Sequence, residues 1–308
     1  MRASRQLIAL ISTIGVALLT SQPAMAWKTH VGSEADRLEF SYHVKDYEAD
    51  IAAHPDDAIA HMNLGNAYAE LGRNTDAFNQ YKLSIQLDPT NARVYHRLGL
   101  LYYYVEDYRS AVQCYLTAVK YKPDFQSAWY ELGITYREME DYKAEIAAMR
   151  KASDLGPFDM MPLIEIGDAY CYLHDKPNAV KAYVQHLWIY PTDTRIRNCA
   201  CLILLELHRT PEATTLAANG LKLATSTYDK TYMQATVADC RRDYARAIPL
   251  YLACHKMKPD EWGPYNNYSN DLYATGHHEQ ARAIWRSLAA GTDTDRADWA
   301  RCQLETHK

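Results

Sequence analysis

The chain has 308 residues, of which 48% are hydrophobic and 23% are charged, and its formal net charge is −5. This composition is typical of a folded protein with a sizeable core and excludes a largely disordered chain. A mildly acidic chain lacks the positive charge that neutralises nucleic-acid phosphates, so nucleic-acid binding is not expected.

Residues 1–26 differ in composition from the rest of the chain. Arg2 and Arg5 form a basic start, residues 7–20 are mostly apolar, and small side chains surround Ala26. This order is typical of a secretory signal peptide and predicts an exported protein of the periplasm or the cell exterior. An uncleaved anchor is the alternative, although the apolar segment is short for a membrane span. After cleavage, no remaining segment is expected to insert stably in a membrane.

Residues 27–57 are predicted to form a single helix, the second half of an incomplete repeat unit. The segment ends near Pro55, in register with the prolines of the units that follow. Its apolar residues recur at helical spacing: Phe40, Val44, Tyr47 and Ile51.

From Ala58 onward the sequence repeats every 34 residues. Prolines mark the period: Pro55, Pro89, Pro123, Pro157 and Pro191, with Pro259 two periods later. The period divides residues 58–293 into seven tandem units: 58–91, 92–125, 126–159, 160–193, 194–227, 228–261 and 262–293. Catalytic motifs do not recur in this way, whereas packing units that need neighbours do.

Each unit is predicted to contain two helices. In the first unit, Leu64 and Gly65 occupy positions seven and eight, and Tyr68 occupies position eleven. Positions seven and eleven are four residues apart, so they share one helical face. The glycine allows close approach of the second helix, on which Ala77 and Tyr81 occupy positions twenty and twenty-four.

The fifth unit departs from this pattern. Ala200 and Cys201 replace the Leu-Gly pair, and Gly220 falls late in the second helix, so looser packing is expected there. Cys199 and Cys201 are two residues apart and therefore point in different directions on a helix. Buried free thiols are expected, with a disulfide to Cys171 as the alternative.

Residues 294–308 are predicted to form a capping helix that covers the apolar side of the last unit. Ala297, Ala300 and Leu304 lie on one face of this segment. Because neighbouring units bury each other's faces, the whole array is expected to behave as one continuous structure.

These positions resemble the tetratricopeptide repeat (TPR) family, specifically an exported bacterial member. The resemblance implies an all-α fold, a right-handed superhelical solenoid of antiparallel helix pairs. It also implies a non-enzymatic scaffold of the bacterial envelope that binds a partner peptide or helix in a concave groove. The alternative is an accessory or regulatory subunit of an envelope enzyme or assembly complex. Such a subunit would contact its partner through the convex face, or would self-associate into a homo-oligomer.

The resemblance further implies which side chains face that groove. The expected contact residues of the first four units are Asn66, Arg93, His96, Tyr103, Tyr104, Tyr130, Arg137, Asp168 and Tyr172. Those of the last three units are Arg195, Asn198, Tyr232, Asn266, Asn270 and Tyr273. Tyrosine and arginine are enriched at protein contacts, although aromatic residues can also pack between repeats. The family's carboxylate clamp is not expected, because Met62 stands where the clamp has a lysine.

No motif for catalysis, a cofactor or a metal is found in the sequence. There is no Gly-rich phosphate loop, no Gly-x-Ser-x-Gly elbow and no His-Glu-x-x-His sequence. The adjacent His277 and His278 are expected in a solvated turn. A minor alternative is an enzyme whose site uses four groove residues: His96, Arg137, Asp168 and Tyr172.

Overall fold

The structure is a computed structural model that describes residues 34–156, 159, 161–292 and 294–307. The signal peptide expected at residues 1–26 and the start of the N-terminal partial repeat lie outside the described residues. Among the helices that are described, none is both long and apolar enough to cross a bilayer.

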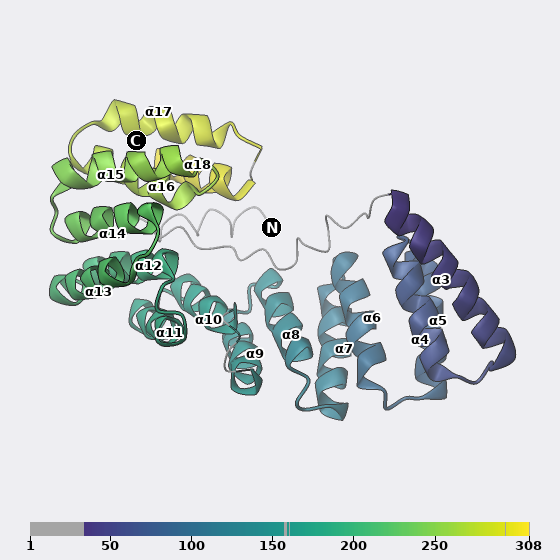
Figure 1. The fold of residues 1–308 in the computed structure, drawn as a ribbon. Helices are drawn as coiled ribbons and strands as arrows, with labels where there is room; N and C mark the ends of the chain where they lie inside the picture. Colours follow the sequence, from purple (N-terminus) through teal and green to yellow (C-terminus); the bar gives the residue numbers. More distant parts are fainter. Residues whose placement is uncertain (1–33, 157–158, 160, 293, 308) are drawn as a thin grey trace. The chain divides into compact units, whose positions relative to one another are not determined.

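The described residues form sixteen α-helices and no strand (Figure 1). Consecutive helices pack against each other in pairs, which confirms the predicted all-α fold. The helices are α3 (Glu34–Ala53), α4 (Ala58–Glu70), α5 (Asn74–Leu87), α6 (Ala92–Tyr104), α7 (Tyr108–Tyr121), α8 (Gln126–Glu138), α9 (Tyr142–Leu155), α10 (Met161–Tyr172), α11 (Lys176–Ile189), α12 (Thr194–Glu206), α13 (Thr210–Leu223), α14 (Thr227–Cys240), α15 (Tyr244–Met257), α16 (Trp262–Ala274), α17 (His278–Ala289) and α18 (Thr294–Thr306).

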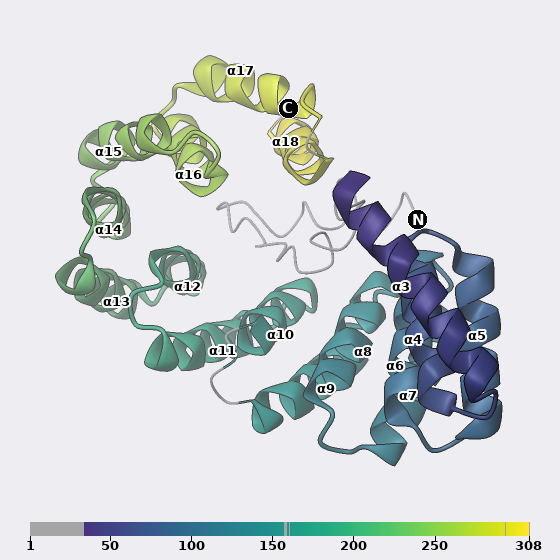
Figure 2. The same ribbon diagram turned by 45° about the vertical axis from the view of Figure 1, so that its right-hand side comes forward.

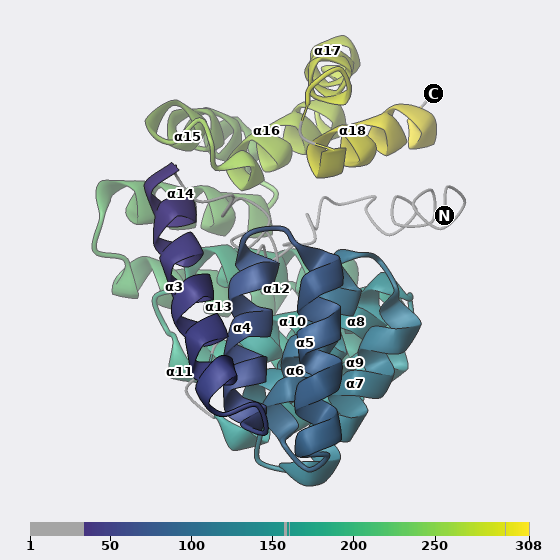
Figure 3. The same ribbon diagram turned by 90° about the vertical axis from the view of Figure 1, so that its right-hand side faces the viewer.

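The described chain divides into two compact units, an N-terminal unit up to Pro162 and a C-terminal unit from Leu163. The sequence predicted one continuous array instead. The division falls where the sequence carries Pro157 and Pro162, and each proline removes a backbone donor and restricts the residue before it. Figure 3 shows α3 to α7 of the N-terminal unit side by side. In the C-terminal unit, α10, α12 and α16 lie on one side and α11, α13 and α15 on the other (Figure 2).

The turn inside each repeat is built in the same way throughout the described residues. The fifteenth residue has left-handed backbone, with φ between 57° and 88°. The next residue then donates its N–H to the carbonyl of residue eleven, as from Arg73 to Tyr68 at 2.8 Å, which ends the first helix. The left-handed residues are Gly72, Glu106, Glu140, His174, His208, Arg242 and Gly276.

The close approach predicted at the Leu-Gly positions is confirmed. A Cβ added to Gly65 would lie 2.7 Å from the ring of Tyr81. A Cβ added to Gly167 would lie 2.2 Å from the ring of Tyr183. Both tyrosine rings are buried, so the absent side chain is what lets the two helices of a unit meet.

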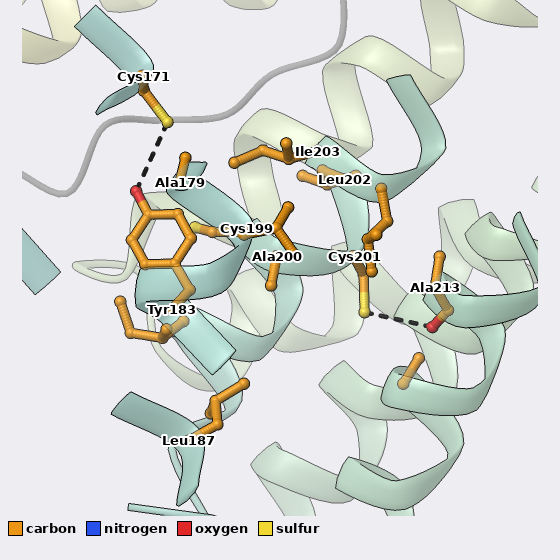
Figure 4. Close-up of a cluster of buried hydrophobic side chains, with 14 of the residues drawn as sticks. Cys171, Ala179, Tyr183, Leu187, Cys199, Ala200, Cys201, Leu202, Ile203 and Ala213 are labelled. Atoms are coloured by element: carbon orange, nitrogen blue, oxygen red, sulfur yellow. Dashed lines mark hydrogen bonds between the residues drawn. The ribbon is translucent and has the colours of Figure 1, made fainter. Parts of the chain in front are cut away.

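The fifth unit does not show the looser packing expected from its sequence. Ala200 and Cys201 are fully buried, and they belong to the largest apolar cluster of the C-terminal unit (Figure 4). Cys201 fits in place of glycine because Ala217 stands where most other units carry tyrosine or tryptophan. The two changes compensate in volume, so the helix pair stays close.

Gly220 makes room for a buried arginine in the same unit. A Cβ at Gly220 would lie 2.2 Å from the Cδ of Arg197. The Arg197 guanidinium donates to the carbonyls of Pro191 and Leu216 at 2.6 and 3.2 Å. The fourth residue of other units caps the preceding proline carbonyl in the same way: His61 on Pro55, Tyr95 on Pro89 and Trp129 on Pro123.

All seven cysteines are free thiols in this structure. Cys171 lies with its Sγ 3.8 Å from the hydroxyl of Tyr183, and Cys201 donates to the carbonyl of Ala213 at 3.4 Å (Figure 4). Burial raises the pKa of the Cys199 thiol to about 12. The thiols act here as small buried side chains, and the disulfide considered for Cys171 is not formed.

The last helix, α18, covers an apolar surface of the final repeat. Ala297 and Ala300 are buried, and Trp299 packs edge-on against Trp262 with ring centroids 5.4 Å apart. This contact removes from water the side of the repeat that has no following unit.

Candidate binding site

A polar pocket of 170 Å³ lies within the C-terminal unit, between the first helices α12, α14 and α16. It lies toward the N-terminal ends of these helices. We refer to it as the polar pocket; its lining residues are Thr194, Arg195, Asn198, Cys199, Tyr228, Asp229, Tyr232, Lys258, Glu261, Trp262, Gly263, Pro264, Asn266 and Asn267.

The polar pocket is held together by side-chain amides. The Asn198 Nδ2 donates to the Thr236 hydroxyl at 2.9 Å, and the Asn198 Oδ1 accepts from Asn267 at 3.1 Å. Asn198 therefore links α12 to both α14 and α16. Asn198 and Asn267 are 2% and 4% exposed, so these bonds are shielded from water and fix the pocket's shape.

Tyr232 places its hydroxyl in the same pocket. A Cβ on Gly263 would lie 3.3 Å from the Tyr232 Oη, so the glycine keeps the space beside the hydroxyl open. The ring is only 3% exposed and packs against Tyr228 and Tyr251. Within the described part of the chain, this hydroxyl has no hydrogen-bond partner. Burial raises the pKa of Tyr232 well above its usual value, so the hydroxyl keeps its proton and remains a donor.

Charged groups surround the mouth of the polar pocket. The Lys258 ammonium lies 4.3 Å from the centroid of the Tyr228 ring, and Arg195 is exposed. Among described residues, neither cation forms a salt bridge. The Asp229 carboxylate accepts from Ser226 at 2.5 Å and from Thr194 at 3.1 Å. Asp229 is thus already satisfied, and Glu261 adds a second carboxylate to the lining, whereas the two cations remain able to bind a ligand.

Four of the predicted groove residues meet in this pocket: Arg195, Asn198, Tyr232 and Asn266. Only Arg195 is exposed. Asn198, Tyr232 and Asn266 are at most 3% exposed, so they are buried within the pocket. A ligand reaches them only by entering the pocket.

Two other predicted groove residues are engaged in internal hydrogen bonds. Asn66 accepts from the Tyr81 hydroxyl at 2.9 Å, and the buried Asp168 accepts from the Tyr183 hydroxyl. Both sit at position nine, where the packing tyrosine of position twenty-four needs an acceptor. Each therefore satisfies a buried tyrosine hydroxyl.

His96 and Tyr273 pack against aromatic side chains. The His96 ring lies 4.9 Å from Phe125 and 5.9 Å from Tyr115, and burial lowers the pKa of His96 to about 4. Tyr273 packs between side chains of the last two helices: Trp285 and His278 of α17, and His307 just after α18.

The N-terminal unit keeps a partly exposed aromatic pair. Tyr103 and Tyr104 lie edge to face with ring centroids 6.2 Å apart, and the Tyr103 hydroxyl donates to Glu138 at 3.3 Å. Arg93 is exposed on the same helix.

The remaining predicted groove residues, from both units, are partly buried: Tyr130, Arg137, Tyr172 and Asn270. Asn270 donates to Asn266 at 3.1 Å.

The N-terminal unit contains the segments that match known families. One TPR repeat model matches residues 65–105, and a tetratricopeptide repeat model matches residues 96–159. Residues 65–159 thus match the tetratricopeptide repeat family. No curated protein matches the chain.

Several solved structures match the chain. YrrB, described as a TPR protein with an unusual peptide-binding site, is 17% identical with a TM-score of 0.50, over 59% of this chain and 94% of YrrB. MamA is 24% identical with a TM-score of 0.48, over 51% of this chain and 92% of MamA. PilF of Pseudomonas aeruginosa is 14% identical with a TM-score of 0.49, over 71% and 97%. At these identities the likeness to YrrB shows a shared fold alone.

Two of the four residues considered for an enzymatic site make other contacts within their own unit. His96 is packed among aromatic rings, and Asp168 is bonded to Tyr183. In the part of the chain that the structure describes, no three side chains form a group that could hold a metal ion.

The sequence prediction missed several residues of the polar pocket. Tyr228 and Lys258 do not fall at positions of the repeat that are expected to face the groove, whereas Gly263 does, at position two of its unit. The one signal in the sequence was Gly263 before Pro264, an unusual pair at the start of a helix.

Proposed function

We propose that this protein is a non-enzymatic TPR scaffold that binds a peptide segment of a partner protein, and that the polar pocket holds one side chain of that segment. The polar pocket supports this proposal, because it combines fixed amides, a free hydroxyl and two cations on the first-helix side of the C-terminal unit.

The size of the pocket favours a single side chain as its ligand. Sites for whole cofactors and drug-sized molecules have volumes of about 300–1,000 Å³. At 170 Å³, the polar pocket is smaller than this range. A single side chain of a partner peptide would fit a pocket of this volume. The interhelical hydrogen bonds of Asn198 keep the pocket formed when no peptide is bound.

The available hydrogen-bond groups favour an acceptor-rich side chain. Arg195 and Lys258 flank the mouth, and the Tyr232 hydroxyl is a donor without a partner among described residues. Asp229 is occupied by two internal hydroxyl donors. A glutamate or aspartate of the partner would therefore pair with the cations and accept from Tyr232, and Glu261 is the one opposing carboxylate of the lining.

Selection of peptides from a random library on the purified protein tests this function. The best peptide is then titrated calorimetrically into wild type, Arg195→Ala and Gly263→Ala. The first change removes a cation, and the second places a methyl group 3.3 Å from the Tyr232 Oη. We expect each to weaken binding about tenfold, which corresponds to about 1.4 kcal/mol.

Arg246→Ala, an exposed arginine on α15, is the matched control and should bind within about twofold of wild type. Because Gly263 precedes a proline, thermal unfolding must confirm that its variant is folded. Peptides that bind all four proteins equally would show that the polar pocket is not the binding site.

We also propose that the protein is exported. The basis is the order of charged, apolar and small residues in positions 1–26. Fractionation of the expressing cells followed by intact-mass measurement tests it. A periplasmic or secreted protein lacking residues 1–26 is expected, and a cytoplasmic full-length chain would contradict it.

A further inference from the structure

A second cavity lies on the opposite side of the C-terminal unit, between the second helices α11 and α13. Its volume is 710 Å³, four times that of the polar pocket. Leu204 of α12 forms the floor and is 3% exposed, while Val180 and Val184 of α11 face Leu216 of α13. We call it the apolar groove; its lining residues are Pro177, Val180, Lys181, Val184, Gln185, Leu204, Arg209, Pro211, Glu212, Thr215, Leu216 and Asn219.

An exposed tryptophan stands beside the apolar groove on the same helix. Trp188 is 83% exposed, whereas Ile59, another exposed large hydrophobic side chain, is 56% exposed. Trp188 follows Val184 by four residues, so both lie on one face of α11. An exposed indole beside an open apolar groove extends that groove into a larger apolar patch, and such a patch is a mark of an interaction surface.

Comparison between the repeats strengthens this reading of Trp188. The tryptophan occupies position twenty-nine of its unit, which is exposed in every unit. The other six units carry small or polar residues there: Gln86, Lys120, Asp154, Lys222, Lys256 and Ala290. The packing of the repeat therefore does not require an apolar side chain at this position, and Trp188 needs another explanation.

We propose that a second copy of this chain covers the apolar groove, with Trp188 of each copy inserted into the groove of the other. A two-fold interface brings the same patch of both copies together, so it requires a projection and a complementary depression in one patch. Trp188 and the apolar groove provide these on one helix.

The spacing along α11 fits such an arrangement. If two α11 helices run antiparallel with the two-fold axis beside Val184, Trp188 of one copy lies opposite Val180 of the other. Each residue is then four positions, or about 6 Å, from the axis. Lys181 also lines the groove there and can place its ammonium over the incoming indole.

The area of this contact sets the expected strength of the dimer. Each buried indole contributes about 200 Å², and the groove walls cover a similar area. Two such insertions bury about 800 Å² in total, which is below the roughly 1,200–2,000 Å² of stable interfaces. The dimer should therefore form at micromolar or higher concentrations rather than at nanomolar ones.

Sedimentation velocity of the full chain between about 1 and 300 μM tests the proposal. Wild type should shift toward the dimer as its concentration rises. Trp188→Lys, which introduces the residue found at this position in three other units, should remain monomeric with unchanged thermal stability. Leu223→Lys is the matched control, an exposed leucine of α13 outside the groove, and should dimerise like wild type. A monomeric wild type, or equal association of Trp188→Lys, would overturn the proposal.

A mixing experiment separates self-association from binding of another partner. Val184→Glu keeps the tryptophan but disrupts the groove, whereas Trp188→Lys keeps the groove but lacks the tryptophan. Each variant alone should be monomeric, and an equimolar mixture should form a heterodimer through one remaining insertion. A mixture that stays monomeric while wild type dimerises would show that another surface joins the copies. None of these substitutions lies in the polar pocket, so the proposed peptide binding is tested independently.

Discussion

Replacing Asp271 by asparagine should change how the stability of the protein depends on pH. Asp271 lies on α16 and is 5% exposed, and one of its carboxyl oxygens has no hydrogen-bond partner among the described residues. Burial, followed by the nearby charge of Asp239, raises the pKa of Asp271 to about 9. Asp239 itself accepts from Tyr251 at 3.3 Å, and burial raises its pKa to about 6. The folded protein therefore keeps Asp271 protonated at neutral pH.

The direction of the effect follows from proton binding. An unfolded aspartate has a pKa of about 3.9, so above about pH 5 the unfolded chain has released a proton that folded Asp271 retains. The contribution of Asp271 to stability is complete below about pH 4 and is lost as pH rises toward 9. Between pH 6 and 8 the loss is on the order of 1 kcal/mol per pH unit, or roughly 2–3 kcal/mol over the interval.

Denaturant unfolding of wild type and Asp271→Asn at pH 6, 7 and 8 measures this difference. Asparagine carries no proton to lose, so the stability of the variant relative to wild type should rise by roughly 2–3 kcal/mol across the interval. Fluorescence is a suitable signal, because Trp262, Trp285 and Trp299 all lie in the last three helices. Ser287→Asn, an exposed change on α17, should show a constant difference.

A relative stability that stays constant within about 0.5 kcal/mol between pH 6 and 8 would refute this reasoning. Such a result would mean that Asp271 is ionised in the folded protein. Its carboxyl group would then be in contact with water, whereas the structure shows it buried.

Two further substitutions test the packing of the repeats. Gly167→Ala places a methyl group within 2.2 Å of the Tyr183 ring. This substitution should lower the free energy of unfolding by about 1–3 kcal/mol. An unchanged denaturation midpoint would show that the two helices can move apart without loss of stability. His96 has its pKa lowered to about 4 by burial, so its contribution to stability is present above about pH 6.5 and is lost as pH falls. Wild type should lose about 2 kcal/mol more than His96→Phe between pH 7 and 5, and an equal loss in both would contradict the buried, neutral ring.

The repeat architecture could be predicted because its decisive contacts are local. Gly65 and Tyr81 lie within one 34-residue unit, and the second side chain fills the space that the first leaves open. The same pairing recurs at Gly167 and Tyr183. A pattern that repeats within each unit can be recognised without knowing how the units stack.

The candidate site was predictable only in part. The family positions located Arg195, Asn198, Tyr232 and Asn266, and these do meet in one pocket. The same positions did not reveal that the Asp168 carboxylate accepts a hydrogen bond from the Tyr183 hydroxyl. Whether a groove position is free depends on the hydrogen bonds of neighbouring side chains, and that cannot be read from its place in the repeat.

The sequence by itself determined the helix pairs, because apolar residues at helical spacing and a glycine opposite a large ring leave few other ways to bury the chain. It did not determine the left-handed turns, where Glu, His and Arg adopt a backbone that favours glycine. Those residues are held by the hydrogen bonds that close the turn. The tertiary structure also decided the polar pocket and the apolar groove, because each is formed by residues of different repeat units whose separation depends on how the units pack.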